Sequence, residues 1–162
     1  MKTSDIAKML LLLFIFSLIL AYFISGASAI SFLFMLPTIL GILLGGVLAS
    51  LAIIFGLLSS SELAIIYKRS KEVKNRDIYG DFLRETKVDT KIIFSSLCLS
   101  VLILLISDIN FIDIPMWFLL GLGLFGLFMS LSAVHDIVMS LFDLNQLRYE
   151  LSTKIERGRK NE

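Results

Sequence analysis

Between Lys8 and Glu62 the chain carries no charged side chain. A helix crosses the hydrocarbon core of a bilayer with about 20 apolar residues, so this uncharged run is long enough for two crossings. Apolar residues make up 57% of the whole chain, above the soluble average of about 45–50%. The sequence therefore predicts an all-α integral membrane protein.

Four transmembrane helices are expected, at 7–25, 38–61, about 90–107 and 115–134. The apolar core of the first helix follows Lys2 and Lys8 and resembles a secretory signal, but its apolar run is long for one, which favours a retained helix. Residues 26–36 are expected to be the connection to the second helix. Pro37 would then occupy the first turn of that helix, where its missing N–H costs nothing.

All 15 Lys and Arg residues lie in three stretches, 1–8, 68–91 and 148–160. A four-span arrangement places these stretches on one side of the membrane. The connections on the other side have no basic residue, and aromatic residues such as Tyr22 and Phe34 suit the interface there. The positive-inside rule then predicts that both termini and the 62–90 loop are cytoplasmic. The membrane is expected to be the bacterial inner, or plasma, membrane.

The second and fourth helices are expected to extend into the cytoplasm. The helical pattern continues past Glu62 into an arm at 62–90, with Asp81 as a candidate cap for the return helix. After Val134 an apolar stripe repeats near 3.5 residues, as in helices that pack together. Its members are Ile137, Leu141, Leu144, Leu151 and Ile155, and Gly158 is a candidate stop signal.

The expected organisation is therefore a transmembrane region at 1–134, including the 62–90 arm, and a cytoplasmic helix with its tail at 135–162. An apolar stripe in water needs a cover. The arm, the same helix in another copy, or a soluble protein could supply it.

Small residues follow one side of the second helix within about 80° on a helical wheel. They are Gly41, Gly45, Ala49, Ala52 and Gly56, and the fourth helix has a second set that includes Gly123 and Gly126. In lipid, helices associate through close backbone approach rather than through hydrophobicity. The two readings left open are packing inside one chain and contact between copies in a homo-oligomer.

Polar residues near the inner surface are the other candidates for a site. The basic cluster of Lys68, Arg69, Lys71 and Lys74 suits anionic lipid headgroups, although setting topology alone explains it too. Acidic residues interleave with these bases, so nucleic acid is not an expected partner. Glu62, His135 and Asp136 could line the inner rim of a pore or could be simple interfacial residues.

Residues that carry enzyme chemistry are missing from the sequence. It has no nucleophile, phosphate-binding or zinc-protease motif and no carboxylate dyad. Its lone Cys98 lies in an apolar run and is expected to be a small buried side chain. No cofactor or metal is predicted, and an enzyme is disfavoured.

The function most compatible with these features is a homo-oligomeric membrane scaffold or sensor that offers a cytoplasmic helical platform to a soluble protein. Small four-span proteins with such arms occur as membrane subunits of bacterial anti-phage systems, which is an analogy of architecture only. The alternative is an ion-conducting or depolarising pore formed between copies. A transporter or a membrane enzyme has less support, since no inverted repeat is visible.

Overall fold

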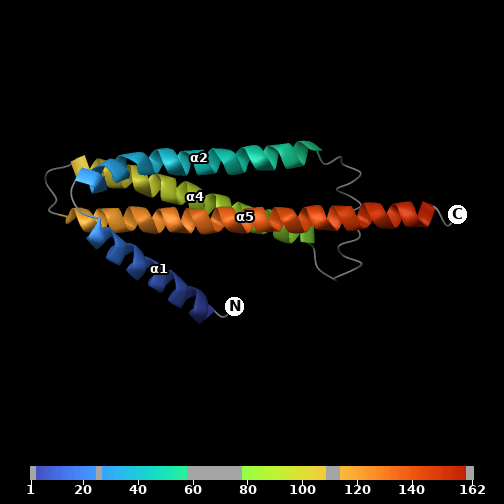
Figure 1. The fold of residues 1–162 in the computed structure, drawn as a ribbon, viewed down its shortest axis with the longest axis horizontal. Helices are drawn as coiled ribbons and strands as arrows, with labels where there is room; N and C mark the ends of the chain where they lie inside the picture. The colour runs from blue at the N-terminus through green and yellow to red at the C-terminus, as the bar shows by residue number, and fades with distance from the viewer. Residues whose placement is uncertain (1–2, 25–26, 58–77, 109–113, 160–162) are drawn as a thin grey trace. The chain divides into compact units, whose positions relative to one another are not determined.

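The computed structural model is all-helical in the residues that it describes, which are 3–24, 27–57, 78–108 and 114–159. Its helices are α1 (Thr3–Phe23), α2 (Ala27–Leu57), α4 (Ile78–Asp108) and α5 (Met116–Arg159) (Figure 1). Three of them are long and apolar enough to cross a membrane, at Ser28–Ala52, Gly80–Ser107 and Met116–Asp143. The apolar part of α1, Ala7–Phe23, is shorter. The all-α class is confirmed, and the three long helices indicate a membrane protein.

The start of α2 differs from the sequence-based expectation. Residues 27–36 are helical rather than a connection, and Pro37 lies inside the helix. The helix continues because Leu33, Leu36 and Leu40 all pack into the interior. An internal proline is tolerated in a helix of membrane type, because neighbouring groups can satisfy the backbone carbonyl that it leaves without a hydrogen bond, and the packed leucines add dispersion contacts.

The helix α4 is also longer than expected, because the return from the 62–90 arm and the third span form one helix from Ile78 to Asp108. Asp81 therefore lies in the first turn and does not cap the helix. Its carboxylate pairs with Arg84 at 3.1 Å on the exposed surface. Asp81 still favours the helix, because a negative charge in the first turn complements the helix dipole.

The helix α5 has 44 residues and runs without a break from Met116 to Arg159. The carbonyl of Pro115 accepts hydrogen bonds from the backbone N–H groups of Phe118 and Leu119, so Pro115 stands at the helix start, as the sequence predicted. Gly158 lies inside the helix rather than after its end.

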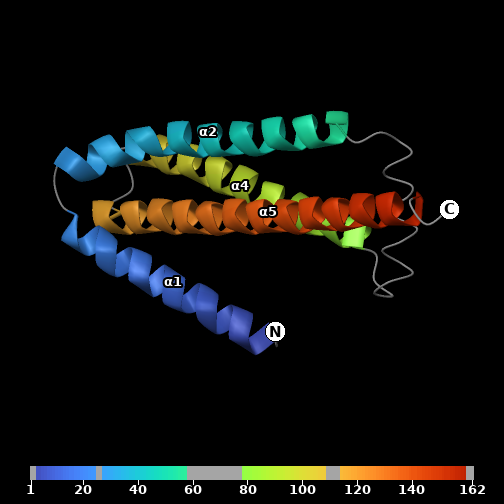
Figure 2. The same ribbon diagram turned by 45° about the vertical axis from the view of Figure 1, so that its right-hand side comes forward.

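Two compact units can be distinguished, and each is described by itself. Unit 1 comprises Met1–Gly45 with Thr90–Ala133, and unit 2 comprises Gly46–Asp89 with Val134–Glu162. In unit 1 the end of α1, the start of α2, the end of α4 and the start of α5 lie together at one end (Figures 1 and 2). This division into two compact units does not test the predicted boundary between a transmembrane region and a cytoplasmic helix at residue 134.

The core of unit 1 draws on all four helices. Its buried members are Ala21, Ala29, Leu33, Ile103, Leu119, Leu120 and Leu124. Both Leu119 and Leu120 are among them because adjacent residues point about 100° apart, so more than one side of α5 is covered in unit 1. This helix therefore lies at the centre of the packing.

Cys98 is exposed, which corrects the prediction of a buried side chain. The buried face of α4 is defined by Ile93, Ser96, Ser100 and Ile103. Cys98 falls on the opposite side of the helix, because two residues advance a helix by about 200°. Its apolar sequence neighbours Leu97 and Leu99 are partly buried, so an apolar run alone does not reveal which of its members faces outward.

Candidate helix-packing faces and a polar cluster

The first glycine contact in unit 1 joins α5 to α1. A Cβ atom on Gly121 would lie 2.5 Å from Cδ2 and 3.3 Å from Cα of Leu18. Real Cβ contacts to backbone atoms are seldom so short, so the close approach of the two helices requires glycine here. The rings of Phe14 and Phe125 meet edge to face at 5.4 Å in the same interface.

The next two glycines of α5 face two other helices. A Cβ on Gly123 would lie 3.1 Å from Cδ2 of Leu36 in α2, and a Cβ on Gly126 would lie 3.5 Å from Cβ of Ser96 in α4. Together with Gly121, these positions let α5 approach each of the other three helices of unit 1. Gly123 and Gly126, the second small-residue set of the sequence, thus lie at helix contacts within the chain.

The small residues of α2 have different surroundings. A Cβ on Gly41 or Gly45 would meet no atom within 4 Å, and Ala49 and Ala52 are exposed. The buried leucines of α2 lie on its other side. Gly56 lies within α2 as well, since the helix extends to Leu57. No described part of the chain packs on Gly41 or Gly45, and their contact with another copy stays a prediction.

Three interior hydroxyls of unit 1 are satisfied within their own helices. Ser17 donates to the carbonyl of Phe14 at 2.7 Å, Ser100 to Leu97 at 2.7 Å and Ser130 to Gly126 at 2.9 Å. A serine bonded to its own backbone presents no free donor to a neighbour. These three hydroxyls therefore need no hydrogen-bond partner on a neighbouring helix.

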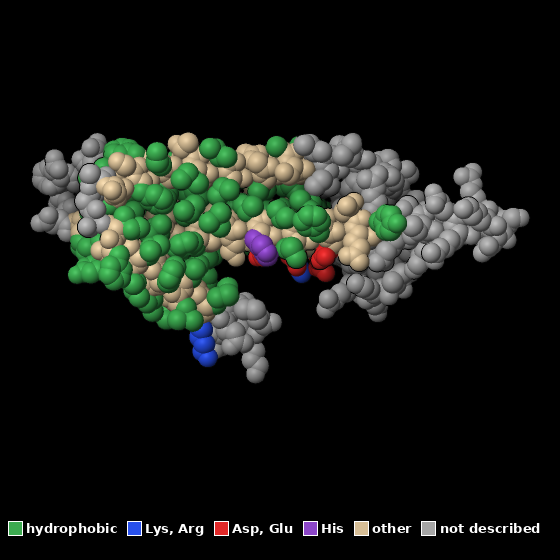
Figure 3. Space-filling model, viewed as in Figure 1, with side chains coloured by type: hydrophobic (Ala, Val, Ile, Leu, Met, Phe, Trp, Pro, Cys, Tyr) green, Lys and Arg blue, Asp and Glu red, His purple; other side chains and the backbone are tan. Residues whose placement is uncertain are grey.

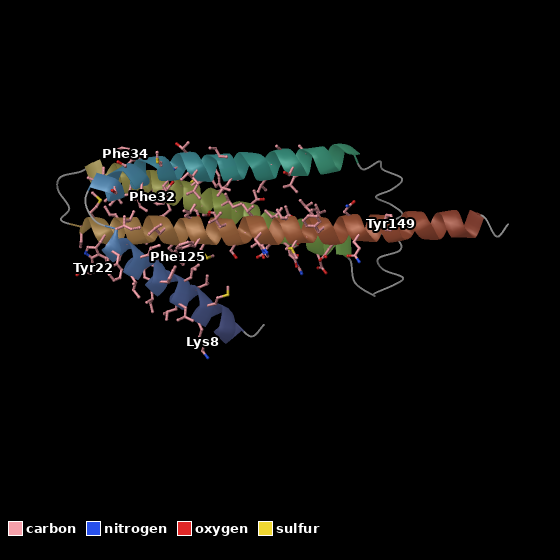
Figure 4. The ribbon with its side chains drawn as sticks, in the orientation of Figure 1. Lys8, Tyr22, Phe32, Phe34, Phe125 and Tyr149 are labelled. Carbon is pink, nitrogen blue, oxygen red and sulfur yellow. The ribbon has the colours of Figure 1, made fainter. Side chains whose placement is uncertain are left out.

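Aromatic residues gather toward one end of unit 1. Tyr22 lies at the end of α1, and Phe32 and Phe34 lie near the start of α2, while Lys8 lies at the far end of α1 (Figure 4). Tyr22 and Phe34 are 69% and 64% exposed. This placement suits an aromatic belt at one membrane interface.

Unit 2 brings three carboxylates together. Asp89 is partly buried, and its carboxylate is repelled by those of Asp136 and Glu85. Ser140 donates to Glu85 at 3.5 Å, a weak contact that ties α5 to α4. Acidic side chains appear at one place on the otherwise largely hydrophobic face shown in Figure 3. Within the described residues, no group of three or more side chains could hold a metal ion.

His135 and Asp136, the two inner-rim candidates that the structure describes, are both exposed. The Nδ1 atom of His135 lies 3.4 Å from Oδ1 of Asp136, although adjacent positions alone did not predict a contact. The remaining candidate, Glu62, lies outside the described residues. So do the four members of the basic cluster, Lys68, Arg69, Lys71 and Lys74.

The predicted partner stripe of α5 begins on a covered face. Ile137 is buried, at 2% exposure, and Leu141 is partly buried. The side chains of Leu144, Leu151 and Ile155 lie outside the described part. A neighbouring face with Val138 and Phe142 is exposed instead. Sequence reasoning missed it, although its members recur at the same 3.5-residue interval.

Neutralising Asp89 tests the carboxylate cluster. We expect Asp89→Asn to raise the melting temperature by about 2–4 °C, because the substitution removes the cost of keeping a partly buried charge from water and the repulsion from Asp136 and Glu85, together roughly 1 kcal/mol. Asp143→Asn is the control, since Asp143 is exposed on the same helix as Asp136 and is not among the groups that repel Asp89. Thermal unfolding in detergent measures both. A lower melting temperature for Asp89→Asn would show that its charge stabilises the fold.

Over the part of the chain that the structure describes, the fold is that of an all-helical protein of membrane type, with three helices of membrane-crossing length. Comparisons with protein families, curated proteins and solved structures give no match to this chain.

Proposed function

We propose that the chain is a non-enzymatic membrane scaffold or sensor that associates with further copies of itself through the outward small-residue face of α2. The observation that supports this is the contrast between two glycine sets. A Cβ added to a glycine of α5 would meet Leu18, Leu36 or Ser96, whereas a Cβ added to Gly41 or Gly45 would meet no atom of the described chain within 4 Å.

The physical reason is the cost of glycine in a helix. Each glycine lowers helix stability by about 1 kcal/mol relative to alanine. At Gly121 close packing inside the chain offsets that cost, but at Gly41, Gly45 and Gly46 an alanine would fit without a clash. Of these three, Gly41 and Gly45 share one side of α2 with Ala49 and Ala52. A second helix approaching this face would use the space that a Cβ would fill, as small residues do in membrane helix pairs.

The platform in this proposal is the C-terminal part of α5. A helix of 44 residues is about 66 Å long, and about 20 residues cross the hydrocarbon core. The rest extends beyond it and carries Leu144, Leu151 and Ile155 of the predicted stripe. A soluble protein that docks there would bury an apolar surface.

The proposed topology has four spans with both termini in the cytoplasm of a bacterial cell, and α1 as the shortest span. It is supported by the restriction of all 15 basic residues to 1–8, 68–91 and 148–160. The cluster Lys68, Arg69, Lys71 and Lys74 would then contact anionic lipid headgroups at the inner surface.

A substitution at Gly45 tests self-association. We expect Gly45→Leu to reduce the particle to a single chain, because the added side chain blocks the face of α2 but meets nothing within its own chain. Gly46→Leu is the matched control: its Cβ also meets nothing within 4 Å, yet it points about 100° away. Molar mass in mild detergent, by light scattering, is the measurement.

The outcome separates the two readings of the α2 small-residue face. Loss of the oligomer in Gly45→Leu alone supports a contact between copies. An unchanged molar mass in Gly45→Leu, or an equal loss in both variants, would contradict a specific contact at this face.

A further inference from the structure

Two exposed lysines of unit 1 lie within its apolar helices. Lys8 belongs to the apolar part of α1, Ala7–Phe23, and Lys91 to the membrane-length part of α4, Gly80–Ser107. Both side chains are exposed, and neither forms an ion pair with another residue that the structure describes. An ammonium group without a carboxylate partner needs water or phosphate oxygens around it, because its charge is costly in hydrocarbon. The two lysines therefore mark where the apolar surface of each helix ends.

The apolar surface that ends at these lysines is short on both helices. From Lys8 to Tyr22, which lies at the aromatic end of α1 (Figure 4), the helix rises about 21 Å. From Lys91 to Asp108, the last residue of α4, the rise is about 25 Å. A hydrocarbon core of ~30 Å is taller than both apolar surfaces, by roughly 5–9 Å. The two helices therefore match a thinner bilayer, unless the leaflet next to the lysines moves inward.

Contacts with α5 give the height of Lys8. In unit 1, α1 runs antiparallel to α5, since the end of α1 lies beside the start of α5 (Figures 1 and 2). Gly121 packs against Leu18. Lys8 lies ten residues before Leu18, which is about 15 Å of helix. Lys8 therefore reaches no farther along α5 than about Leu131, which lies ten residues after Gly121.

Contacts of α4 give the same height for Lys91. Gly126 of α5 packs against Ser96, and Lys91 lies five residues before Ser96, about 8 Å of helix. Helix α4 also runs antiparallel to α5 in unit 1 (Figures 1 and 2), so Lys91 too reaches about Leu131. From Met116, where α5 begins, to Leu131 the rise is only about 22 Å. Two helices with different contacts thus agree on one short apolar height.

Helix α2 presents a much taller apolar surface to lipid. It has no charged residue over its 31 residues, which is about 46 Å of helix. The apolar surface of the protein is therefore uneven, because it is tall at α2 and short at α1 and α4. A flat leaflet cannot match both heights.

We propose that Lys8 and Lys91 bind phosphate groups of phospholipid headgroups, and that the adjacent leaflet bends inward by several Å around α1 and α4. A lysine side chain covers part of the difference in height by extending toward the headgroups, and the bend covers the rest. The contact needs neither self-association nor a soluble partner, so it goes beyond the proposed function. Bilayer thickness would then be the stimulus of the proposed sensor, and this last step rests on that function.

Nanodiscs of three thicknesses test the bend. They contain dimyristoleoyl-, dioleoyl- or dierucoyl-phosphatidylcholine, whose acyl chains increase in length in that order. The melting temperature is followed by the fluorescence of the single Trp117. We expect it to be highest with the shortest chains and to fall by several degrees with the longest, because the leaflet must then bend farther around the two lysines.

Substitutions connect this fall in melting temperature to the two lysines. Lys8→Leu and Lys91→Leu should each lessen the fall, because each lengthens the apolar surface of its helix. Lys8→Arg should leave the fall unchanged, since a guanidinium group also binds phosphate. Lys87→Leu is the matched control, because Lys87 is exposed on nearly the same side of α4, one turn beyond Lys91.

A fall that Lys8→Leu and Lys91→Leu lessen, and that Lys87→Leu leaves unchanged, supports the bend. The same melting temperature in all three lipids, or the highest one with the longest chains, would show that extended lysine side chains suffice and would overturn the proposal. A fall that neither substitution lessens, or that the control lessens equally, overturns it too. The molar mass tests self-association separately: a single chain with this lipid dependence contradicts the proposed function and leaves the lysine contact standing.

Discussion

Replacing Gly121 with leucine is expected to force α1 away from α5 and to lower the melting temperature by several degrees. A Cβ at this position would already lie 2.5 Å from Cδ2 and 3.3 Å from Cα of Leu18. Overpacking costs about 1–3 kcal/mol, and each kcal/mol lowers the melting temperature of a chain of this size by about 2–4 °C. The single Trp117 lies one turn before Gly121 in α5, so its fluorescence can follow unfolding.

Two further variants make the expectation specific. Gly126→Ala should change the melting temperature by less than about 2 °C, because its Cβ would rest in ordinary contact at 3.5 Å from Cβ of Ser96. Adding Leu18→Ala to Gly121→Leu should restore part of the lost melting temperature, because the smaller side chain at position 18 leaves space for the new leucine. A Gly121→Leu variant as stable as the original chain would contradict the close approach of α1 and α5.

The second large effect is expected at Leu120, which is fully buried in the core of unit 1. Leu120→Ala removes packed methyl groups and leaves a cavity, and such changes cost about 2–5 kcal/mol. Leu131→Ala on the same helix should cost less than about 1 kcal/mol, since Leu131 is 46% exposed and loses few contacts. Unfolding in mixed detergent, followed by Trp117 fluorescence, measures both.

The comparison between these two leucines is the useful quantity, because both variants change side-chain volume equally. A difference of about 1 kcal/mol or more supports the assignment of Leu120 to the core. Equal losses of unfolding free energy in the two variants would contradict the structure, in which Leu120 is buried and Leu131 is exposed.

The sequence predicted the helical class and the unbroken α5 well, because long apolar runs and a 3.5-residue repeat are strong local signals. It was wrong about 27–36 and Pro37, because this stretch is helical and the proline lies inside α2, where Leu33, Leu36 and Leu40 pack against the neighbouring helices. It was wrong about Cys98 for a related reason. Tertiary packing sets how a helix is rotated, and periodicity alone does not reveal which side faces inward when both sides are apolar.

The same limit explains the candidate sites. Gly45 and Gly123 belong to small-residue sets that look alike in sequence, yet one faces outward and the other contacts Leu36. In α5 the strongest apolar repeat begins at Ile137, which is buried, while the weaker repeat through Val138 and Phe142 is exposed. The neighbours that separate these faces are distant in the chain.

The proposed self-association through the outward face of α2 is tested most directly by the number of chains per particle. Native mass spectrometry of the unmodified protein, extracted with its lipids in nanodiscs, gives that number. We expect a mass of two or more chains of 18.2 kDa. A particle that holds a single chain in these nanodiscs would contradict the proposed function.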